Sequence, residues 1–334
     1  MAIKSRSTAA ITIIVAIAAV SPLVFIFGND YITGTLTRIL ILGLLVLSVE
    51  LAWGQTGMFT LGQAVFFGVG AYAAAVSAKD HGVTDVLALL VIAGVAGLII
   101  GLVIGVFLFT GRRVSELYVA LFTLALAYAA QRLATSWSVI GAANGIPGIP
   151  FPTIFGFKLD SGPILFYLAL IAFAIFFLLC LWVVNSQFGL AMNAIRDDEE
   201  RAEFFGYRRQ AIQVLVFTGT AGLAAVGGGL FAVTEGFVSP SLLGIALSTS
   251  AVLWVVLGGK GTFFGPLIAL AVLQVLDRRM QDAFPQFWPI AIGALLLITI
   301  VFLPKGLMSI PQVYRERKSQ RELRHNVPIR EEIK

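Results

Sequence analysis

A dense block of charge, NAIRDDEERAEFFGYRR at residues 193–209, separates two long apolar segments of this chain. Within it Ile195, Ala202 and Phe205 are spaced seven and three residues apart, which places them on one face of a helix. Gly206 follows, and glycine commonly ends a helix. The pattern predicts a short amphipathic helix that presents aromatic side chains beside mixed charge. Such a helix could dock in a groove of a partner protein or lie on the lipid surface, and the residues alone leave both possibilities open.

Two glycine-rich polar stretches interrupt the apolar sequence, WGQTGMFTLGQAVFFGVGAY at residues 53–72 and WVVLGGKGTFFGP at residues 254–266. Interruptions of this kind provide hydrogen bonds at membrane depth, as in the solute paths of transporters. The hydroxyl of Thr60 and the amide of Gln63 could bind a small polar solute. The alternative is helix packing, in which internal partners satisfy the same groups. The candidate path residues are Gly57, Thr60, Gly62, Gln63, Phe66, Phe67, Tyr72, Asn144, Glu235 and Ser239.

The sequence offers no motif for catalysis or metal binding. The stretch around Lys260 is not a nucleotide-binding loop, because Gly261 follows the lysine where such a loop has Ser or Thr. The chain has no H-E-x-x-H and no G-x-S-x-G motif. Cys180 is the single cysteine, and His81 and His325 are far apart in the sequence. We therefore expect a protein that is not an enzyme, with no metal or cofactor on this chain, so that any ATP hydrolysis takes place on another chain.

Composition indicates that these motifs lie in an integral membrane protein. Hydrophobic residues make up 58% of the chain, charged residues only 12%, and the mean hydropathy is +0.94, whereas soluble domains carry about 25% charge. The predicted fold is an all-α, polytopic helical bundle of about ten transmembrane segments, each spanning roughly 30 Å of hydrocarbon. The apolar runs lie near residues 8–27, 36–53, 64–78, 86–110, 117–134, 164–184, 213–233, 243–257, 264–280 and 288–303.

The lengths and flanking charges of these runs predict the topology. The runs at 64–78 and 243–257 are short for a full span, so we expect broken or re-entrant helices whose free backbone faces protein or water. Seventeen of the 23 Lys and Arg residues are cytosolic if the N-terminus is cytosolic, which fits the positive-inside rule. The net charge of +5 then indicates topology and contact with lipid, not nucleic acid. We expect a transmembrane domain at 1–310, with a cytosolic loop at 186–212, and a charged cytosolic tail at 311–334.

Five stretches taken in order resemble the permease subunits of ATP-binding-cassette importers of the branched-chain amino acid class, which also take up urea and short amides. The similarity runs from about residue 40 to residue 308. It implies an importer of the bacterial cytoplasmic membrane, in which the ten segments and the positive-inside rule place both termini of this chain in the cytosol. It also implies three kinds of partner: a second homologous permease, two cytosolic ATPase subunits that carry ATP and Mg, and an extracytoplasmic solute-binding protein. The stretches are residues 53–72, 188–207, 236–241, 254–266 and 284–307.

By this resemblance, the charged loop is the coupling helix of the permease. ATP binding would move the helix and tip the paired permeases between outward-facing and inward-facing states, which must differ in their affinity for the solute. The candidate contacts with the ATPase are Ile195, Arg196, Asp197, Glu200, Arg201, Phe205, Gly206 and Tyr207.

The solute is the least determined part of this interpretation. Residues 60–63, 284–288 and 304–307 are similar to urea-type subunits, so we expect urea or a short-chain amide, with branched-chain amino acids as the alternative. Residues 248–250 are Ser-Thr-Ser where family members often carry an acidic residue, and this departure leaves the transported molecule open.

Two other classes of transporter stay open from the residues alone. A secondary transporter would bind its coupling ion at buried acids, and Glu50 and Glu235 are the candidates. A passive urea or water channel would need no coupling helix at all.

Overall fold

The long apolar runs fold into helices that are long enough to cross a membrane. The structure, a computed structural model, describes residues 30–111, 114–154 and 156–283. Five spans in these ranges confirm the prediction of an all-α, multi-pass membrane protein. The predicted segments at 8–27 and 288–303, together with the charged tail, lie outside the described residues. The spans are α2 (Asp30–Val49) with its π-helical extension η1 (Glu50–Gln55), α4 (Val86–Phe109), α5 (Glu116–Ser136), α6 (Gly162–Asn185) and α9 (Arg209–Glu235).

Shorter helices flank the two glycine-rich stretches. The first break, residues 56–62, separates η1 from α3 (Gln63–Asp80), and the second break, residues 259–263, separates α10 (Ile245–Gly258) from α11 (Phe264–Ala283). With 14 residues, α10 extends about 21 Å and is too short to cross the hydrocarbon alone. The prediction of interrupted helices at these two places is therefore confirmed.

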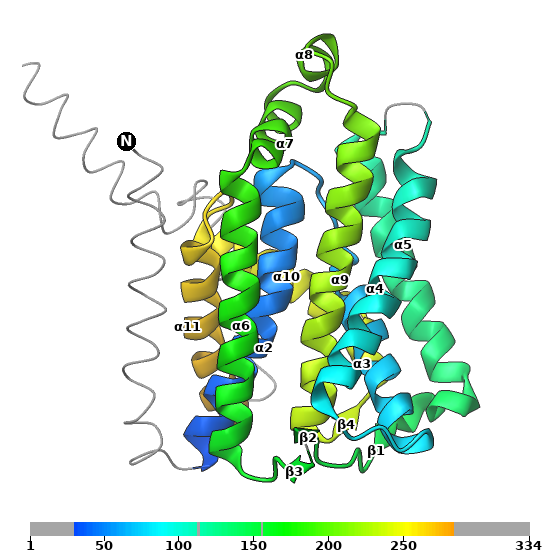
Figure 1. The fold of residues 1–334 in the computed structure, drawn as a ribbon, viewed down its shortest axis with the longest axis vertical. Helices are drawn as coiled ribbons and strands as arrows, with labels where there is room; N and C mark the ends of the chain where they lie inside the picture. Colours follow the sequence, from blue (N-terminus) through cyan, green and yellow to red (C-terminus); the bar gives the residue numbers. More distant parts are fainter. Residues whose placement is uncertain (1–29, 112–113, 155, 284–334) are drawn as a thin grey trace, which may run out of the picture.

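The two ends of the bundle differ in structure (Figure 1). Helices α7 (Gln187–Asp197) and α8 (Glu199–Phe204) project at one end, which we call the hairpin end. Short antiparallel strand pairs, β1 with β4 and β2 with β3, close the other end. The elements there are η2 (Ser138–Ile140), η3 (Ala142–Asn144), β1 (Ile146–Pro147), β2 (Thr153–Ile154), β3 (Phe157–Lys158), β4 (Phe237–Val238) and η4 (Pro240–Leu243).

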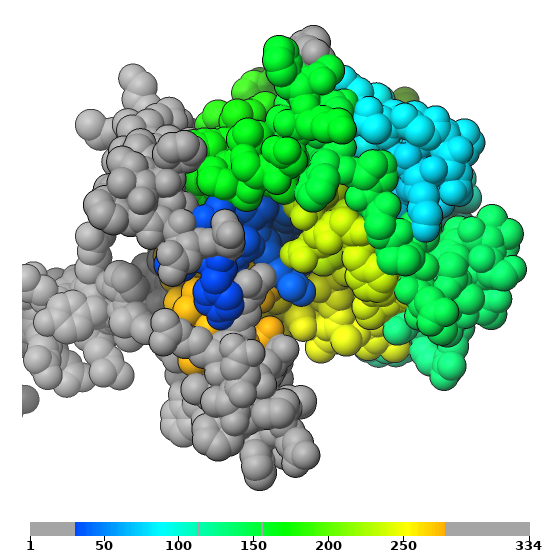
Figure 2. Space-filling model, turned by 90° about the horizontal axis from the view of Figure 1, so that it is seen from below, coloured from blue at the N-terminus to red at the C-terminus, as the bar shows by residue number. Residues whose placement is uncertain are grey.

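Helix α9 is the interior helix of the bundle. Of its most apolar 18 residues, 83% are buried, against 28% for α4, so α4 presents a broad outer face. Helix α9 packs against α3, α4 and α2, while α6 packs on α2 and α10 on α11. Figure 2 shows the end opposite the hairpin, where the residues around the end of α9 (yellow) lie between the start of α2 (blue) and the loop after α5 (teal green).

Small residues let α9 approach its neighbours backbone to backbone. A Cβ atom on Gly70 of α3 would collide with the backbone of Ala225, and one on Gly228 of α9 would collide with the backbone of Phe67. On α4, a Cβ atom on Gly97 would collide with the Ala225 side chain. Close approach through small residues is how membrane helices gain packing energy without a hydrophobic driving force.

Substitution of Gly228 by alanine is expected to destabilise the fold, because the new methyl group meets backbone that cannot rotate away. We expect a loss of roughly 1–3 kcal/mol, the usual range for overpacking. The control is Gly219→Ala on the same helix, where an added Cβ has nothing within 4 Å. The measurement is the midpoint of thermal aggregation of the detergent-solubilised protein. Equal midpoints for the two variants would contradict the close approach of α3 and α9.

Candidate functional site

The charged loop folds as two helices, not as the single helix expected from its spacing. Asp198 has an extended backbone (φ −162°), and its carboxylate accepts hydrogen bonds from the N–H groups of Glu200 at 3.0 Å and Arg201 at 3.1 Å. Asp198 is thus the N-cap of α8, and its extended backbone ends α7. Ile195 and Ala202 are buried in the chain, whereas Phe205 is 82% exposed. The prediction that these three side chains share one helical face is therefore wrong.

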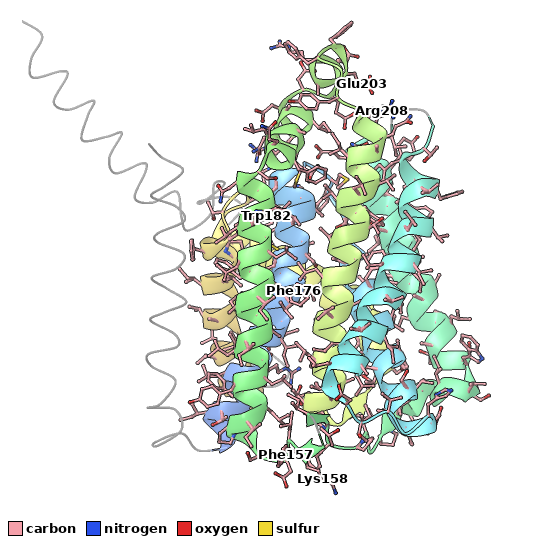
Figure 3. The ribbon with its side chains drawn as sticks, in the orientation of Figure 1. Phe157, Lys158, Phe176, Trp182, Glu203 and Arg208 are labelled. Atoms are coloured by element: carbon pink, nitrogen blue, oxygen red, sulfur yellow. The ribbon has the colours of Figure 1, made fainter. Side chains whose placement is uncertain are left out.

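The tip of the α7–α8 hairpin presents aromatic side chains to the outside. Phe204 is 89% exposed, Phe205 is 82% exposed and Tyr207 is 40% exposed. Gly206 has a φ of +87°, so it turns the chain directly after α8, which confirms the predicted stop. The neighbouring charged residues Glu203 and Arg208 are also exposed at this end of the bundle (Figure 3). Sequence reasoning named Phe205 and missed Phe204, although the Phe-Phe pair was the available signal.

A buried arginine fixes the hairpin to the start of α9. Arg209 is only 3% exposed; its Nε donates to Glu203 Oε1 at 3.0 Å and its Nη1 donates to Gln213 Oε1 at 3.0 Å. The Arg209 Nη1 atom also lies 3.6 Å from Glu199 Oε2, and Gln213 Nε2 donates to Glu199 Oε1 at 3.0 Å. Sequence reasoning missed this cluster because spacing did not indicate which charges of the loop turn inward.

The hairpin also contacts the first glycine-rich stretch. Arg196 Nη1 donates to the Gly54 carbonyl at 2.7 Å, and the side chain of Arg196 covers Gly57. The Arg196 Nε atom lies 3.5 Å from Asp197 Oδ1. Thus Arg196, which the sequence suggested as a contact with a partner, binds within the chain at the end of η1.

Glu50 connects the two glycine-rich stretches at the same end of the bundle. This carboxylate is fully buried, and its Oε1 atom accepts hydrogen bonds from the Gly261 N–H at 2.8 Å and from Gln55 Nε2 at 3.1 Å. Lys260, beside Gly261, places its Nζ atom 5.3 Å from the centre of the Trp53 ring. The end of α2, the loop after α10 and helix α7 therefore meet in one hydrogen-bonded cluster.

The first break re-enters the bundle and joins the start of α3 to two other helices. The Leu61 N–H donates to Thr123 Oγ1 of α5 at 3.0 Å, and the Ala64 N–H donates to Ser248 Oγ of α10 at 3.3 Å. Thr60 Oγ1 lies 3.5 Å from Gln63 Oε1. Gln63 Nε2 is buried and has no hydrogen-bond partner among the described residues. Gln63 thus has a donor without a partner among the described residues of the bundle interior.

The remaining candidate path residues lie at different depths. Phe66 and Phe67 are completely buried and pack edge-on against Phe217 and Phe231 of α9. For this pair the structure supports helix packing, the alternative interpretation, and not a path wall. Gly62 packs against the Thr123 backbone, and Tyr72 is buried with no partner for its hydroxyl among the described residues. The other three, Asn144, Glu235 and Ser239, lie at the end opposite the hairpin.

Among the described residues, no group of three or more His, Cys, Asp or Glu side chains could hold a metal ion. In the glycine-rich loop at 258–262, Gly258 packs directly against Gly265 and Pro266. This stretch is therefore a contact between α10 and α11.

Comparison of the chain with known proteins gives a matching family and several relatives. A family described as "Branched-chain amino acid transport system / permease component" matches residues 31–301. The chain is 30% identical over 306 residues to the high-affinity branched-chain amino acid transport system permease protein LivM of Escherichia coli K12, covering 84% of this chain and 70% of the relative. It is 29% identical over 173 residues to the high-affinity branched-chain amino acid transport system permease protein BraD of Pseudomonas aeruginosa, covering 49% of this chain and 55% of the relative.

A more distant relative carries a different name. The chain is 27% identical over 257 residues to the autoinducer 2 import system permease protein LsrC of Salmonella paratyphi B, covering 73% of this chain and 71% of the relative. No solved structure matches the chain.

Replacement of Arg209 by glutamine is expected to release the hairpin from α9, because Glu199 and Glu203 lose their shared buried cation. Amide hydrogen exchange at residues 199–207 should accelerate by about tenfold, since charge-assisted hydrogen bonds contribute about 1.5–3 kcal/mol. The control is Arg208→Gln, which changes the exposed neighbouring arginine. Unchanged exchange in the Arg209 variant would show that other contacts hold the hairpin.

Proposed function

This chain belongs to the family of branched-chain amino acid transport system permease components, and we propose that it is the membrane-spanning subunit of an ATP-binding-cassette importer for branched-chain amino acids. It acts in the bacterial cytoplasmic membrane with the hairpin end facing the cytosol. The relatives reported above are named for branched-chain amino acids or for autoinducer 2. The proposal therefore adopts the amino acid alternative instead of urea or a short amide, and the urea-like runs at 284–288 and 304–307 lie outside the described residues.

The observation that carries this proposal is the aromatic tip of a hairpin that is hydrogen-bonded to the end of η1, directly before the first break. Exposed phenyl rings on a charged surface are a typical protein-docking feature. Behind the tip, Arg209 fixes α8 to α9, while Arg196 binds the Gly54 carbonyl of η1. Glu50 continues the connection to Gly261 at the second break. A displacement of the tip therefore acts on the backbone of both interrupted helices.

In the proposed cycle, this chain pairs with a second homologous permease, and each permease binds one cytosolic ATPase subunit. ATP and Mg are held by the ATPase subunits, and an extracytoplasmic binding protein delivers the solute. Closure of the ATPase dimer shifts the two hairpins, and the permeases move between outward-facing and inward-facing states as packed bodies. Transport is driven because the solute has different affinities for the two states.

The alternative of an ion-driven transporter loses one of its two candidate acids. Glu235 is exposed at the end of α9, so it lacks the burial expected for a coupling-ion site. A passive channel gives no account of the exposed Phe204 and Phe205. The importer accounts for both the hairpin and the hydrogen bonds behind it.

Replacement of both Phe204 and Phe205 by serine is expected to release the ATPase subunits, because aromatic anchors at an interface commonly contribute 2 kcal/mol or more each. Recovery of ATPase with the purified permease should fall by about tenfold or more. The control is Phe157→Ser, which removes a phenylalanine that is 78% exposed at the opposite end of the bundle (Figure 3). Full recovery of ATPase with the double variant would contradict docking through this tip.

Purification of the importer from its native membrane in mild detergent tests the function directly. In the presence of its binding protein, leucine, isoleucine or valine should raise ATP turnover, whereas urea and acetamide should not. Stimulation by urea alone would reassign the solute and keep the importer. Purification of the chain alone, or only as a homo-oligomer, would contradict the importer itself.

A further inference from the structure

A cavity of about 290 Å³ lies between α2, α10, α11 and the end of α9, away from the hairpin. Its wall combines apolar side chains, including Phe231 and Trp254, with polar ones, including Ser250 and Gln274. Small-molecule sites have volumes of about 300–1,000 Å³. At about 290 Å³ the cavity lies just below this range and suits a solute of few atoms.

Among the described residues that line this cavity, Arg38 of α2 is the cation. It lies 17 residues before Gln55 in a continuous helical span, which places it about 25 Å from the hairpin end. Its guanidinium carbon is 5.7 Å from the centre of the Phe231 ring. Its Nε atom is buried and has no hydrogen-bond partner among the described residues. A charged side chain inside a span is costly, so a donor left in this state indicates a binding function.

Asp277 of α11 gives the same cavity an anion. It lies 13 residues after Phe264, about 20 Å along α11 from the second break. The described wall of the cavity therefore includes a guanidinium and a carboxylate from two different helices. Leu42 and Leu253 add to the apolar wall between these two elements. An oppositely charged pair beside apolar side chains matches a zwitterion that carries an aliphatic group.

We propose that this cavity is a binding site for an aliphatic α-amino acid, with Arg38 on the α-carboxylate and Asp277 on the α-ammonium group. A guanidinium presents two parallel N–H donors, which suit a carboxylate. Trp254, Phe231 and the leucines contact the aliphatic side chain. Urea carries no charge and would leave the Arg38 guanidinium without an ionic partner in the ligand. The class of solute rests on the proposed function, whereas the location and the two charged contacts are new.

Photolabelling of the complete importer tests the location. The probe is the diazirine analogue of leucine, which keeps both charged groups, and labelled peptides are identified by mass spectrometry. We expect labels in the peptides of α9, α10 and α11 that line the cavity. Excess leucine should protect these peptides, whereas leucinamide, which lacks the carboxylate, should not.

Charge variants test the assignment of the two contacts. Arg38→Gln should reduce labelling about tenfold or more, since hydrogen bonds to charged groups contribute about 1.5–3 kcal/mol. Arg132→Gln is the matched control, because Arg132 is a second arginine in a span but donates to Tyr128 Oη at 3.2 Å on the exposed side of α5. In Asp277→Asn, 4-methylpentanoate, which lacks the ammonium group, should compete as well as leucine does. A structural role for Asp277 would not produce this change in selectivity.

A second variant at the cavity wall tests the site without changing its charge. If Arg38→Gln does not reach the membrane, Ala246→Phe replaces it, because Ala246 is exposed at the cavity wall and a phenyl ring there would block labelling without removing charge. The site would be overturned, and the proposed function left intact, by either of two results in an importer whose wild type takes up leucine. In the first, the labels lie in peptides outside the cavity. In the second, the Arg38 variant is labelled as fully as the wild type. ATP turnover stimulated by urea but not by leucine would overturn the amino acid as solute, both in the proposed function and in the proposed binding site.

Discussion

The requirement that every backbone polar group at membrane depth finds an internal partner governs this structure. Two interrupted helices release N–H and C=O groups inside the bundle, and side chains from other helices satisfy them. Glu50 accepts from Gly261, Thr123 accepts from Leu61, and Ser248 accepts from Ala64. Each of these bonds joins elements that are 62 or more residues apart. The two breaks are thus the points at which hydrogen bonds join distant parts of the chain.

The same requirement connects the surface hairpin with the interior. The Gly54 carbonyl, freed near the end of η1, is satisfied by Arg196 from α7 at 2.7 Å. Since Arg209 holds α8 against α9, the hairpin has firm contacts on two sides. A partner that binds the exposed phenyl rings therefore pushes on a stiff element and not on a loose loop. Stiffness of this kind is what a mechanical connection between an ATPase and a membrane path requires.

The bundle divides by the type of its packing. Helices α3, α4 and α9 touch through glycine and alanine, with backbone against backbone, and such contacts tolerate little relative motion. Helices α2, α10 and α11 meet α9 around a cavity that contains Arg38 and Asp277. The cavity lies where the close-packed helices meet α2, α10 and α11. This arrangement allows one group of helices to move against the other while the contacts among α3, α4 and α9 stay intact.

The sequence by itself determined the fold class, the position of most helices and the two breaks, because apolar length and glycine-rich polar interruptions are local properties of the chain. It also located the charged loop and the turn at Gly206. Only the tertiary structure decided which side chains of these elements face inward. Asp198 caps a second helix, so Ile195 turns into the protein while Phe204 and Phe205 turn out. Phe66 and Phe67 pack on α9, and Arg38 and Asp277 line the same cavity. These outcomes depend on contacts between residues far apart in the sequence, which local spacing does not encode.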